Sequence, residues 1–177
     1  DRTNGVFQVE SAGMKDLLIR LKPKLEQLDF EVISVILALY RPDSMGALDE
    51  YVEMATGGSR PPSIHPDMDE ILKDTNYCMI YQEQLLDIVK KFGGRTYGGA
   101  DLFRKAIGKK IVELVQKESE ILRGEIVANG YSKEIADKIA NELSQKGGYL
   151  FNKSHSYSYA VLCFETAWFK AHYPTYF

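Results

Sequence analysis

The most basic stretch of the chain opens on two glycines, Gly98 and Gly99. Residues 95–110 hold one acid, Asp101, among five bases: Arg95, Arg104, Lys105, Lys109 and Lys110. Glycines at the start of a helix leave backbone N–H groups open to a phosphate. Arg104 and Lys105 project about 100° apart on that helix, so together they can hold an extended anion from two directions. These residue types indicate a phosphate site.

The same residues have a simpler explanation, which the spacing leaves open. Asp101 and Lys105 are four residues apart, as in ordinary ion pairs on the exposed face of a helix. The spacing alone does not separate a phosphate site from such a solvated basic face. The stretch is not a Walker loop, because the pattern GxxxxGK[ST] does not occur in the chain.

A second polar and aromatic segment leads into the last predicted helix. It consists of Phe151, Asn152, Lys153, Ser154, His155, Ser156, Tyr157, Ser158 and Tyr159. Lys153 and the helix N-terminus could bind phosphates, and the aromatic rings could stack on bases. The alternative is a capping loop whose tyrosines pack into the core. From the residue types alone, the capping loop is favoured.

The remaining candidates indicate neither catalytic nor metal chemistry. The segment Tyr81-Gln82-Glu83-Gln84 is typical of a polar helix face. Two acidic pairs are better explained as surface carboxylates than as metal ligands: Asp49 with Glu50, and Asp67 with Asp69. Cys78 and Cys163 lack CxxC spacing and lie in apolar stretches, so we expect buried thiols rather than a disulfide. We therefore expect no catalytic and no metal-binding residue in the chain.

Composition and charge place the chain among ordinary globular proteins. Its 177 residues are 45% hydrophobic and 27% charged, and no apolar run approaches the roughly 18 residues of a membrane span. Residues 1–90 carry 9 bases and 16 acids (net −7), whereas residues 91–177 carry 13 bases and 9 acids (net +4). A local basic patch in an acidic chain favours a defined phosphate site over general attraction to nucleic acid. We expect a cytoplasmic protein without membrane contact.

Helical periodicity dominates the chain and indicates an all-α fold. Apolar residues recur at helical spacing in eight segments: 14–21, 32–40, 47–55, 80–92, 99–108, 111–128, 133–146 and 156–172. The last helix is expected to bury a face made of Val161, Phe164, Ala167, Trp168 and Ala171. At most one short strand is expected, at residues 6–9. The predicted fold is an irregular assembly of about eight helices in two lobes.

A proline-rich stretch divides these helices into two parts. Residues 59–66 contain three prolines and cannot form a regular helix, so we expect a connecting loop and a hinge there. Residues 1–58 are expected to form an N-terminal helical part, and residues 67–177 a second part that carries the basic stretch. Because the chain begins at Asp1 and ends at Phe177, shortly after a proline, we expect an internal segment of a longer polypeptide.

Five motifs in order along the chain resemble those of the bacterial DNA polymerase III alpha subunit family, the C-family replicative polymerases. They are Gly5-Val6-Phe7-Gln8 with Glu10-Ser11 and Gly13-Met14; Tyr81-Gln82-Glu83-Gln84; Gly98-Gly99-Ala100-Asp101 with Arg104-Lys105 and Gly108-Lys109-Lys110; Phe151-Asn152-Lys153-Ser154-His155-Ser156 with Tyr159-Ala160; and Lys170-Ala171-His172-Tyr173-Pro174. Each motif alone is weakly specific, but their order and spacing cover nearly the whole chain. The chain therefore resembles an internal fragment of the fingers region, beginning just past the palm.

The resemblance implies a DNA-directed DNA polymerase that extends a primer by nucleotidyl transfer, with Mg²⁺ held by aspartates of the palm. Those aspartates would lie before residue 1, so the acids of this chain are not assigned to them. The fragment alone is expected to be inactive. The expected partners are a deoxynucleoside triphosphate (dNTP), primer–template DNA, the rest of the polymerase chain and other replisome subunits.

By motif position, the resemblance also assigns roles to single residues. Arg104 and Lys105 would neutralise the triphosphate of the incoming nucleotide. Lys109 and Lys110 would support them. The residues that would border the nucleotide or the template strand are Asn152, Lys153 and His155.

Two departures from the family pattern leave the subfamily open. Asp43-Ser44 follows Arg41-Pro42 where family members usually have Gly-Pro, and Lys105 stands where they usually have Arg. Lys keeps the charge but loses the bidentate fork, so its grip on phosphate is less directional. A different class of function also stays open, a free-standing helical module that binds a protein partner and uses its basic segment for docking or solubility.

Overall fold

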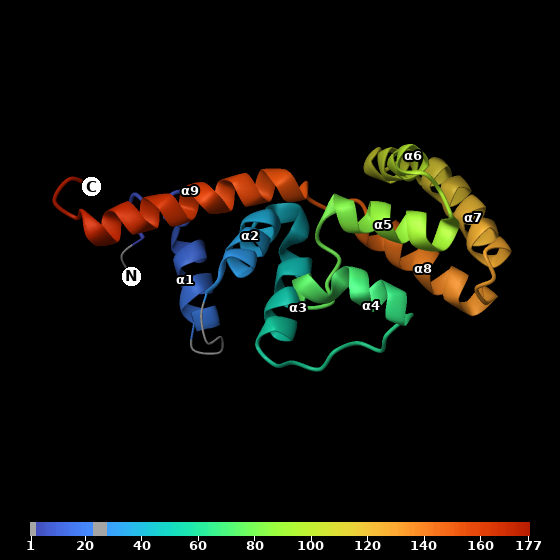
Figure 1. The fold of residues 1–177 in the computed structure, drawn as a ribbon, viewed down its shortest axis with the longest axis horizontal. Coiled ribbons are helices and arrows are strands. Elements are labelled where there is room, and N and C mark those ends of the chain that lie inside the picture. The colour runs from blue at the N-terminus through green and yellow to red at the C-terminus, as the bar shows by residue number, and fades with distance from the viewer. Residues whose placement is uncertain (1–2, 23–27) are drawn as a thin grey trace. The chain divides into compact units, whose positions relative to one another are not determined.

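Helices account for most of the chain in this computed structural model, which describes residues 3–22 and 28–177 (Figure 1). The described residues form nine α-helices and two short 3-10 helices. They contain no strand, only one isolated parallel bridge between Tyr81 and Phe151. The all-α fold class predicted from the sequence is confirmed.

Local capping signals set several of the helix ends. In chain order the helices are α1 (Ala12–Leu21), α2 (Phe30–Leu39), η2 (Pro42–Ser44), α3 (Met45–Ala55), α4 (Pro66–Leu72), η3 (Lys73–Thr75), α5 (Gln82–Gly93), α6 (Tyr97–Gly108), α7 (Val112–Ala128), α8 (Lys133–Lys146) and α9 (Lys153–His172). The predicted N-caps Asp29 and Ser132 both accept a hydrogen bond from the first turn of their helix. The last helix starts three residues before the predicted Ser156, because Asn152 is its N-cap.

By their contacts the helices divide into two compact units, which are described separately. The first unit is made of Asp1–Ser59 and Asn152–Phe177, and the second of Arg60–Phe151. The sequence predicts that residues 152–177 belong with residues 67–151, whereas in the structure they pack with the N-terminal unit. A division of the sequence into consecutive parts cannot represent this arrangement, because α9 pairs with α2 across more than a hundred residues.

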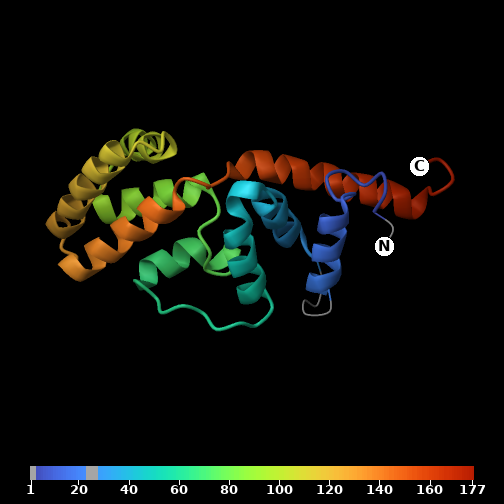
Figure 2. The same ribbon diagram turned by 180° about the vertical axis from the view of Figure 1, so that it is seen from behind.

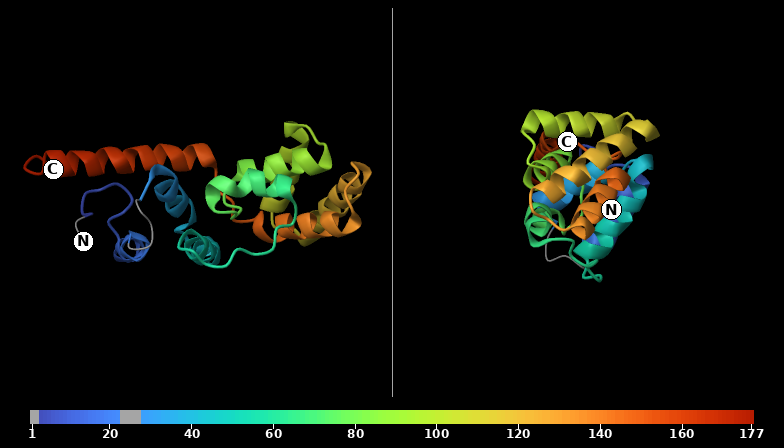
Figure 3. Two further views of the ribbon diagram at one scale, coloured as in Figure 1. Left: turned by 60° about the horizontal axis from the view of Figure 1, so that its bottom comes forward. Right: turned by 90° about the vertical axis from the view of Figure 1, so that its right-hand side faces the viewer.

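The first unit is built on the packing of α2 along α9, which the views of Figures 2 and 3 both show. The buried residues of α9 are small: Ser156, Ala160 and Cys163. The hydroxyl of Ser156 donates to the carbonyl oxygen of Ser34 at 2.5 Å and lies 3.0 Å from the Ser34 hydroxyl, so the two helices approach closely. The prediction that α9 buries the face containing Val161 and Trp168 is wrong, since their side chains are 44% and 49% exposed.

The first residues of the unit form turns and not the short strand considered at residues 6–9. Gly5 and Gln8 have φ values of 78° and 65°, which reverse the chain twice within four residues. The N–H of Val6 donates to the carbonyl of Thr3 at 2.9 Å, closing the first turn. The N–H of Phe7 donates to the Thr166 hydroxyl at 3.0 Å, so this segment is fastened to α9 instead of to a strand partner.

The second unit has a core of fully buried side chains from α5, α6, α7 and α8. Its largest members are Leu85, Ile88, Phe92, Phe103 and Leu122. The helices α7 and α8 lie side by side (Figure 1), and α5 packs on α6, α7 and the short α4. This packing gives α6 a buried face and an exposed face, and the exposed face carries the basic residues.

The helix α4 begins at Pro66, a residue that the sequence predicts to lie in the connecting loop. Proline is compatible with the first position of a helix, because its missing N–H has no partner there in any case. The ring nitrogen Nδ1 of His65 accepts from the N–H of Asp67 at 3.1 Å and caps the helix. The loop of the described chain therefore ends one residue earlier than predicted.

Candidate nucleotide-binding helix

The start of α6 is open, and its two glycines are not needed by the fold. The Thr96 side chain is the N-cap and accepts from the N–H of Gly99 at 3.2 Å. A Cβ atom built on Gly98 would meet only the Thr96 hydroxyl, at 3.9 Å, and one on Gly99 would meet Arg95 Cβ at 3.4 Å. Neither glycine has a positive φ. The glycines therefore leave the first turn of α6 uncovered without serving a turn or a close packing contact.

The opposite face of α6 is anchored in the core of its unit. Ala100 and Phe103 are fully buried, and Ala106 and Ile107 nearly so. The loop before the helix is tied to α7 by Arg95. Its Nε donates to Glu125 at 2.7 Å and its Nη1 to Glu118 at 3.2 Å, with little solvent exposure. Of the five bases counted in this stretch, Arg95 thus serves the fold and holds α6 in place.

On the exposed face, Arg104 and Lys105 are brought together by Asp101. The Nε and Nη2 of Arg104 lie 2.8 and 2.7 Å from the Asp101 oxygen Oδ1. The Nζ of Lys105 lies 2.8 Å from the other oxygen, Oδ2. The hydrogen bond from Lys105, followed by that from Arg104, lowers the pKa of Asp101 below its ordinary value. The ion pair expected from the spacing is therefore formed, and both cations stay accessible, with side chains 28% and 60% exposed.

The segment Tyr81-Gln82-Glu83-Gln84 has a larger structural role than the sequence predicts. The Gln84 oxygen Oε1 accepts from the N–H groups of Ile80 and Tyr81 at 2.8 and 2.9 Å and caps α5. Next to it, the Gln82 oxygen Oε1 lies 3.5 Å from Nη1 of Arg104. The signal that could have predicted the cap is a Gln at the third helical position, as in a capping box.

Lys109 and Lys110 lie at the far end of α6 from the glycines. Lys109 is the C-cap, and Lys110 follows with a φ of 55°, its N–H donating to the Ile107 carbonyl at 3.0 Å. Both residues follow the last helical residue, Gly108. The structure thus brings Arg104 and Lys105 together on Asp101, while Lys109 and Lys110 lie at the C-terminal end of α6.

The predicted contacts Asn152, Lys153 and His155 belong to the other unit, in the first turn of α9. The Asn152 oxygen Oδ1 accepts from the N–H of His155 at 2.9 Å and from the Ser154 hydroxyl at 2.7 Å. The Nζ of Lys153 lies 5.1 Å from the centre of a tyrosine ring, and the His155 ring is 4.3 Å from another. The capping function favoured from the sequence is confirmed for Asn152, while both tyrosines stay partly exposed.

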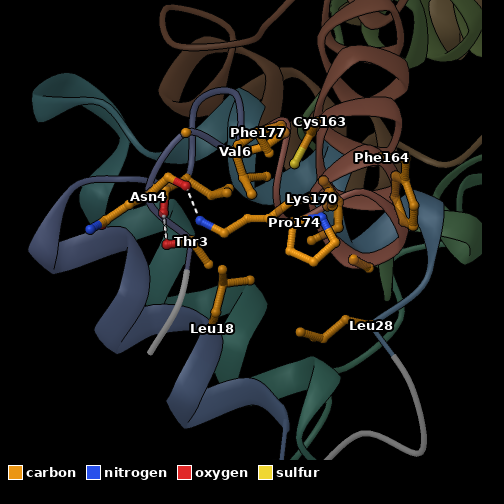
Figure 4. A pocket seen from close by; sticks show the side chains of 15 residues that line it. Thr3, Asn4, Val6, Leu18, Leu28, Cys163, Phe164, Lys170, Pro174 and Phe177 are labelled. Atoms are coloured by element: carbon orange, nitrogen blue, oxygen red, sulfur yellow. Dashed lines mark hydrogen bonds between the residues drawn. The ribbon is translucent and has the colours of Figure 1, made fainter.

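A mainly apolar pocket lies in the first unit. Its volume is about 790 Å³, and Figure 4 shows it between the first residues of the chain, α1 and α9. The Nζ of Lys170 donates to the Asn4 carbonyl at its edge. Burial raises the pKa of the Cys163 thiol, which lines it, and both cysteines are buried and outside any disulfide, as predicted. None of the seven predicted site residues lines this pocket.

Two features are absent from residues 3–22 and 28–177, the part of the chain that the structure describes. No group of three or more His, Cys, Asp or Glu side chains is placed to hold a metal ion in that part of the chain. None of the helices described there combines the length and the apolar character needed to cross a membrane.

The fold and the clustered bases define a helical domain with an exposed basic face. A model of the family described as the bacterial DNA polymerase III alpha subunit finger domain matches residues 1–130. The chain belongs to this family, which confirms the resemblance found in its motifs and argues against a free-standing interaction module.

Curated relatives extend the similarity to the whole chain. Three of them carry the name DNA polymerase III subunit alpha. The protein of Halalkalibacterium halodurans is 39% identical over 175 residues, that of Aquifex aeolicus 40% over 179 and that of Escherichia coli 38% over 182. Each alignment covers 99% of this chain but 15% of the relative. The chain therefore spans about a seventh of the length of these relatives.

Proposed function

We propose that this chain forms the fingers of a replicative DNA polymerase and that Arg104 and Lys105 bind the triphosphate of the incoming dNTP. The observation that carries the proposal is the pair of accessible cations held on one carboxylate, one turn after the open glycine turn of α6. The bases lie on the same helix as the exposed Gly98 of its first turn. This combination suits an extended polyanion such as a triphosphate.

The proposed chemistry is electrostatic. Negative charge on the departing pyrophosphate grows in the transition state of nucleotidyl transfer, and a guanidinium held nearby stabilises that state more than the ground state. Lys109 and Lys110 extend the positive surface toward the far end of the triphosphate or the DNA. Mg²⁺ would be held by palm aspartates outside this chain, so the chain alone would not catalyse the reaction.

The start of α9 would provide the second contact, with nucleotide or template strand. Lys153 and His155 stand in the first turn of α9, where the helix dipole favours an anion. Asn152 would act mainly by capping that turn, because its Oδ1 already accepts two hydrogen bonds. The remaining proposed partners are primer–template DNA, the rest of the polymerase chain and other replisome subunits, in the cytoplasm.

The test is nucleotide addition by the full-length polymerase that carries Arg104→Ala. We expect kcat/KM for the correct dNTP to fall about 10²-fold, or roughly 3 kcal/mol, as for the loss of one electrostatic stabiliser. Binding of primer–template without nucleotide should change little. Arg123→Ala is the matched control, because Arg123 on α7 also pairs with an acid three residues earlier, Glu120, at 2.6 Å.

Two results would contradict the proposal. If Arg104→Ala weakens DNA binding but leaves nucleotide kinetics intact, α6 faces the duplex instead of the triphosphate. If neither quantity changes, or if Arg123→Ala has the same effect, the bases of α6 form only a solvated face.

A further inference from the structure

Asp101 stands in an electrostatically unfavourable place if α6 binds a triphosphate. It is the one acid between residues 95 and 110, and it lies directly between the two proposed phosphate ligands. A carboxylate beside a polyanion repels it. Electrostatics alone therefore predict that removing Asp101 would strengthen nucleotide binding.

The geometry points to a different role. We propose that Asp101 is a positioning residue, which holds the Arg104 guanidinium and the Lys105 ammonium in the arrangement that receives the triphosphate. This inference rests on the function proposed for Arg104 and Lys105 above. Asp101 would not touch the nucleotide and would act through the two bases.

Each carboxylate oxygen of Asp101 holds a different base. Oδ1 accepts from Nε and Nη2 of Arg104 at 2.8 and 2.7 Å, and Oδ2 from Nζ of Lys105 at 2.8 Å. The acid of a comparable pair, Glu134 on α8, contacts a single base of its own helix, Lys138, at 2.7 Å. Asp101 thus differs from an ordinary surface partner, because it joins two cations that leave the helix about 100° apart.

The direction in which Asp101 turns the two bases supports the proposal. Asp101 lies one turn closer to the helix N-terminus than Arg104 and Lys105. Both cations are therefore drawn back along α6, toward the end where Gly98 leaves the backbone uncovered. The Nη1 of Arg104, which does not bind Asp101, donates to Gln82 Oε1 at 3.5 Å, and this restrains the guanidinium plane from a second side.

Holding these side chains in advance has a physical benefit. Arg and Lys lose rotamer freedom when they bind a ligand, and a partner that orders them beforehand lowers that cost. The benefit is largest where charge must be placed correctly in the transition state, so it should be seen in kcat. The repulsion between Asp101 and the triphosphate should be seen in ground-state binding. The two effects therefore have opposite signs and can be separated.

The experiment uses the full-length polymerase with Asp101→Ala, Asp101→Asn and Asp101→Glu. Single-nucleotide incorporation gives kcat and KM for the correct dNTP, and inhibition by tripolyphosphate gives ground-state affinity for the polyanion. For Asp101→Ala we expect kcat to fall about 10-fold or more, with unchanged or tighter tripolyphosphate binding. Asp101→Asn should lose less, because one oxygen remains for Arg104, and Asp101→Glu should recover part of kcat. Glu134→Gln, the control on α8, should leave both quantities unchanged.

A second measurement shows whether Asp101 acts through the bases. Asp101→Ala added to the double variant Arg104→Ala, Lys105→Ala should cause no further loss of kcat. The inference is overturned if Asp101→Ala leaves or raises kcat/KM, since the carboxylate then only competes with the ligand. It is also overturned if the loss persists without the two bases, which would indicate a general structural role. If Arg104→Ala itself has no effect on nucleotide kinetics, the proposed function fails instead.

Discussion

The substitution Gly98→Ala distinguishes a glycine that the fold requires from a glycine that a bound ligand requires. The nearest protein atom to the added methyl group would be the Thr96 hydroxyl at 3.9 Å, an ordinary contact distance. Gly98 lies in the first turn of α6 and its φ is not positive, so Ala is compatible with the backbone. The substitution should therefore leave the structure of α6 unchanged.

The expected effects on stability and activity have opposite directions. Ala is favoured over Gly inside a helix by up to about 1 kcal/mol, and by less in the first turn, so the melting temperature should stay the same or rise. The methyl group would occupy space beside the N–H groups of the first turn, where a bound phosphate oxygen would approach to about 3 Å. A displacement of about 1 Å can cost up to 10²-fold in rate, so kcat/KM for the dNTP should fall between about 10-fold and 10²-fold.

The assay is single-nucleotide incorporation by the full-length polymerase, together with thermal unfolding of the same preparation. Gly124→Ala on α7 is the matched control, because a Cβ there meets nothing within 4 Å and so, like one on Gly98, causes no clash. This control should raise stability slightly and leave nucleotide kinetics unchanged. Wild-type kinetics in Gly98→Ala would refute the reasoning, because no phosphate would then approach this turn. A loss of stability would contradict the open space around Gly98.

Three further predictions concern the basic face and the isolated chain. Lys105→Ala should reduce kcat/KM less than Arg104→Ala, because a point charge is more easily replaced by a neighbouring lysine. Lys138→Ala, which removes the base of another i,i+4 pair, should have no effect. The pKa of Asp101 is depressed, so its ion pairs should persist above the unfolded-state pKa and be lost as pH falls through the folded-state pKa. A carboxyl NMR titration should show this, with the midpoint returning upward in the double variant Arg104→Ala, Lys105→Ala. The isolated 177-residue chain with Mg²⁺ should not extend a primer, and labelled-nucleotide incorporation above a no-enzyme control would contradict this.

Local signals explain why most helices could be predicted from the sequence. A cap such as Asp29 or Ser132 involves residues three apart and depends on no distant partner. The helix α4 (Pro66–Leu72) was not predicted, because its local signals can be interpreted in two ways. Three prolines in eight residues suggest a loop, but Pro66 is compatible with the first position of a helix, where the cap comes from His65.

The buried face of α9 could not be predicted, because it depends on a distant helix. Apolar residues occur all round α9, so helical periodicity does not select one side. The selection comes from the packing on α2, where the Ser156 hydroxyl donates to the carbonyl oxygen of the buried Ser34 and lies beside its hydroxyl. Small neighbours such as Ala160 then allow the two helices to approach, and large side chains such as Trp168 are left on the outside.

Within the candidate site, distance along the chain decides what could be predicted. Asp101 precedes Arg104 and Lys105 by three and four residues on one helix, so its contacts with both follow from the sequence. The contact between Gln82 and Arg104 depends on the packing of α5 against α6, which no local pattern encodes. The same holds for the assignment of Lys153 to the unit that contains α2.

The two explanations first offered for the basic stretch turn out not to exclude each other. An ordinary ion pair requires only that Asp101 lie four residues before Lys105, and that pair is present. The structure adds that the same carboxylate also holds Arg104 through its other oxygen. A surface pair that contributes little to stability can still order two long side chains. An anion that binds at α6 would therefore contact two cations that Asp101 already holds together. Asp101 is therefore the residue whose substitution most directly distinguishes a solvated basic face from a site prepared for a triphosphate.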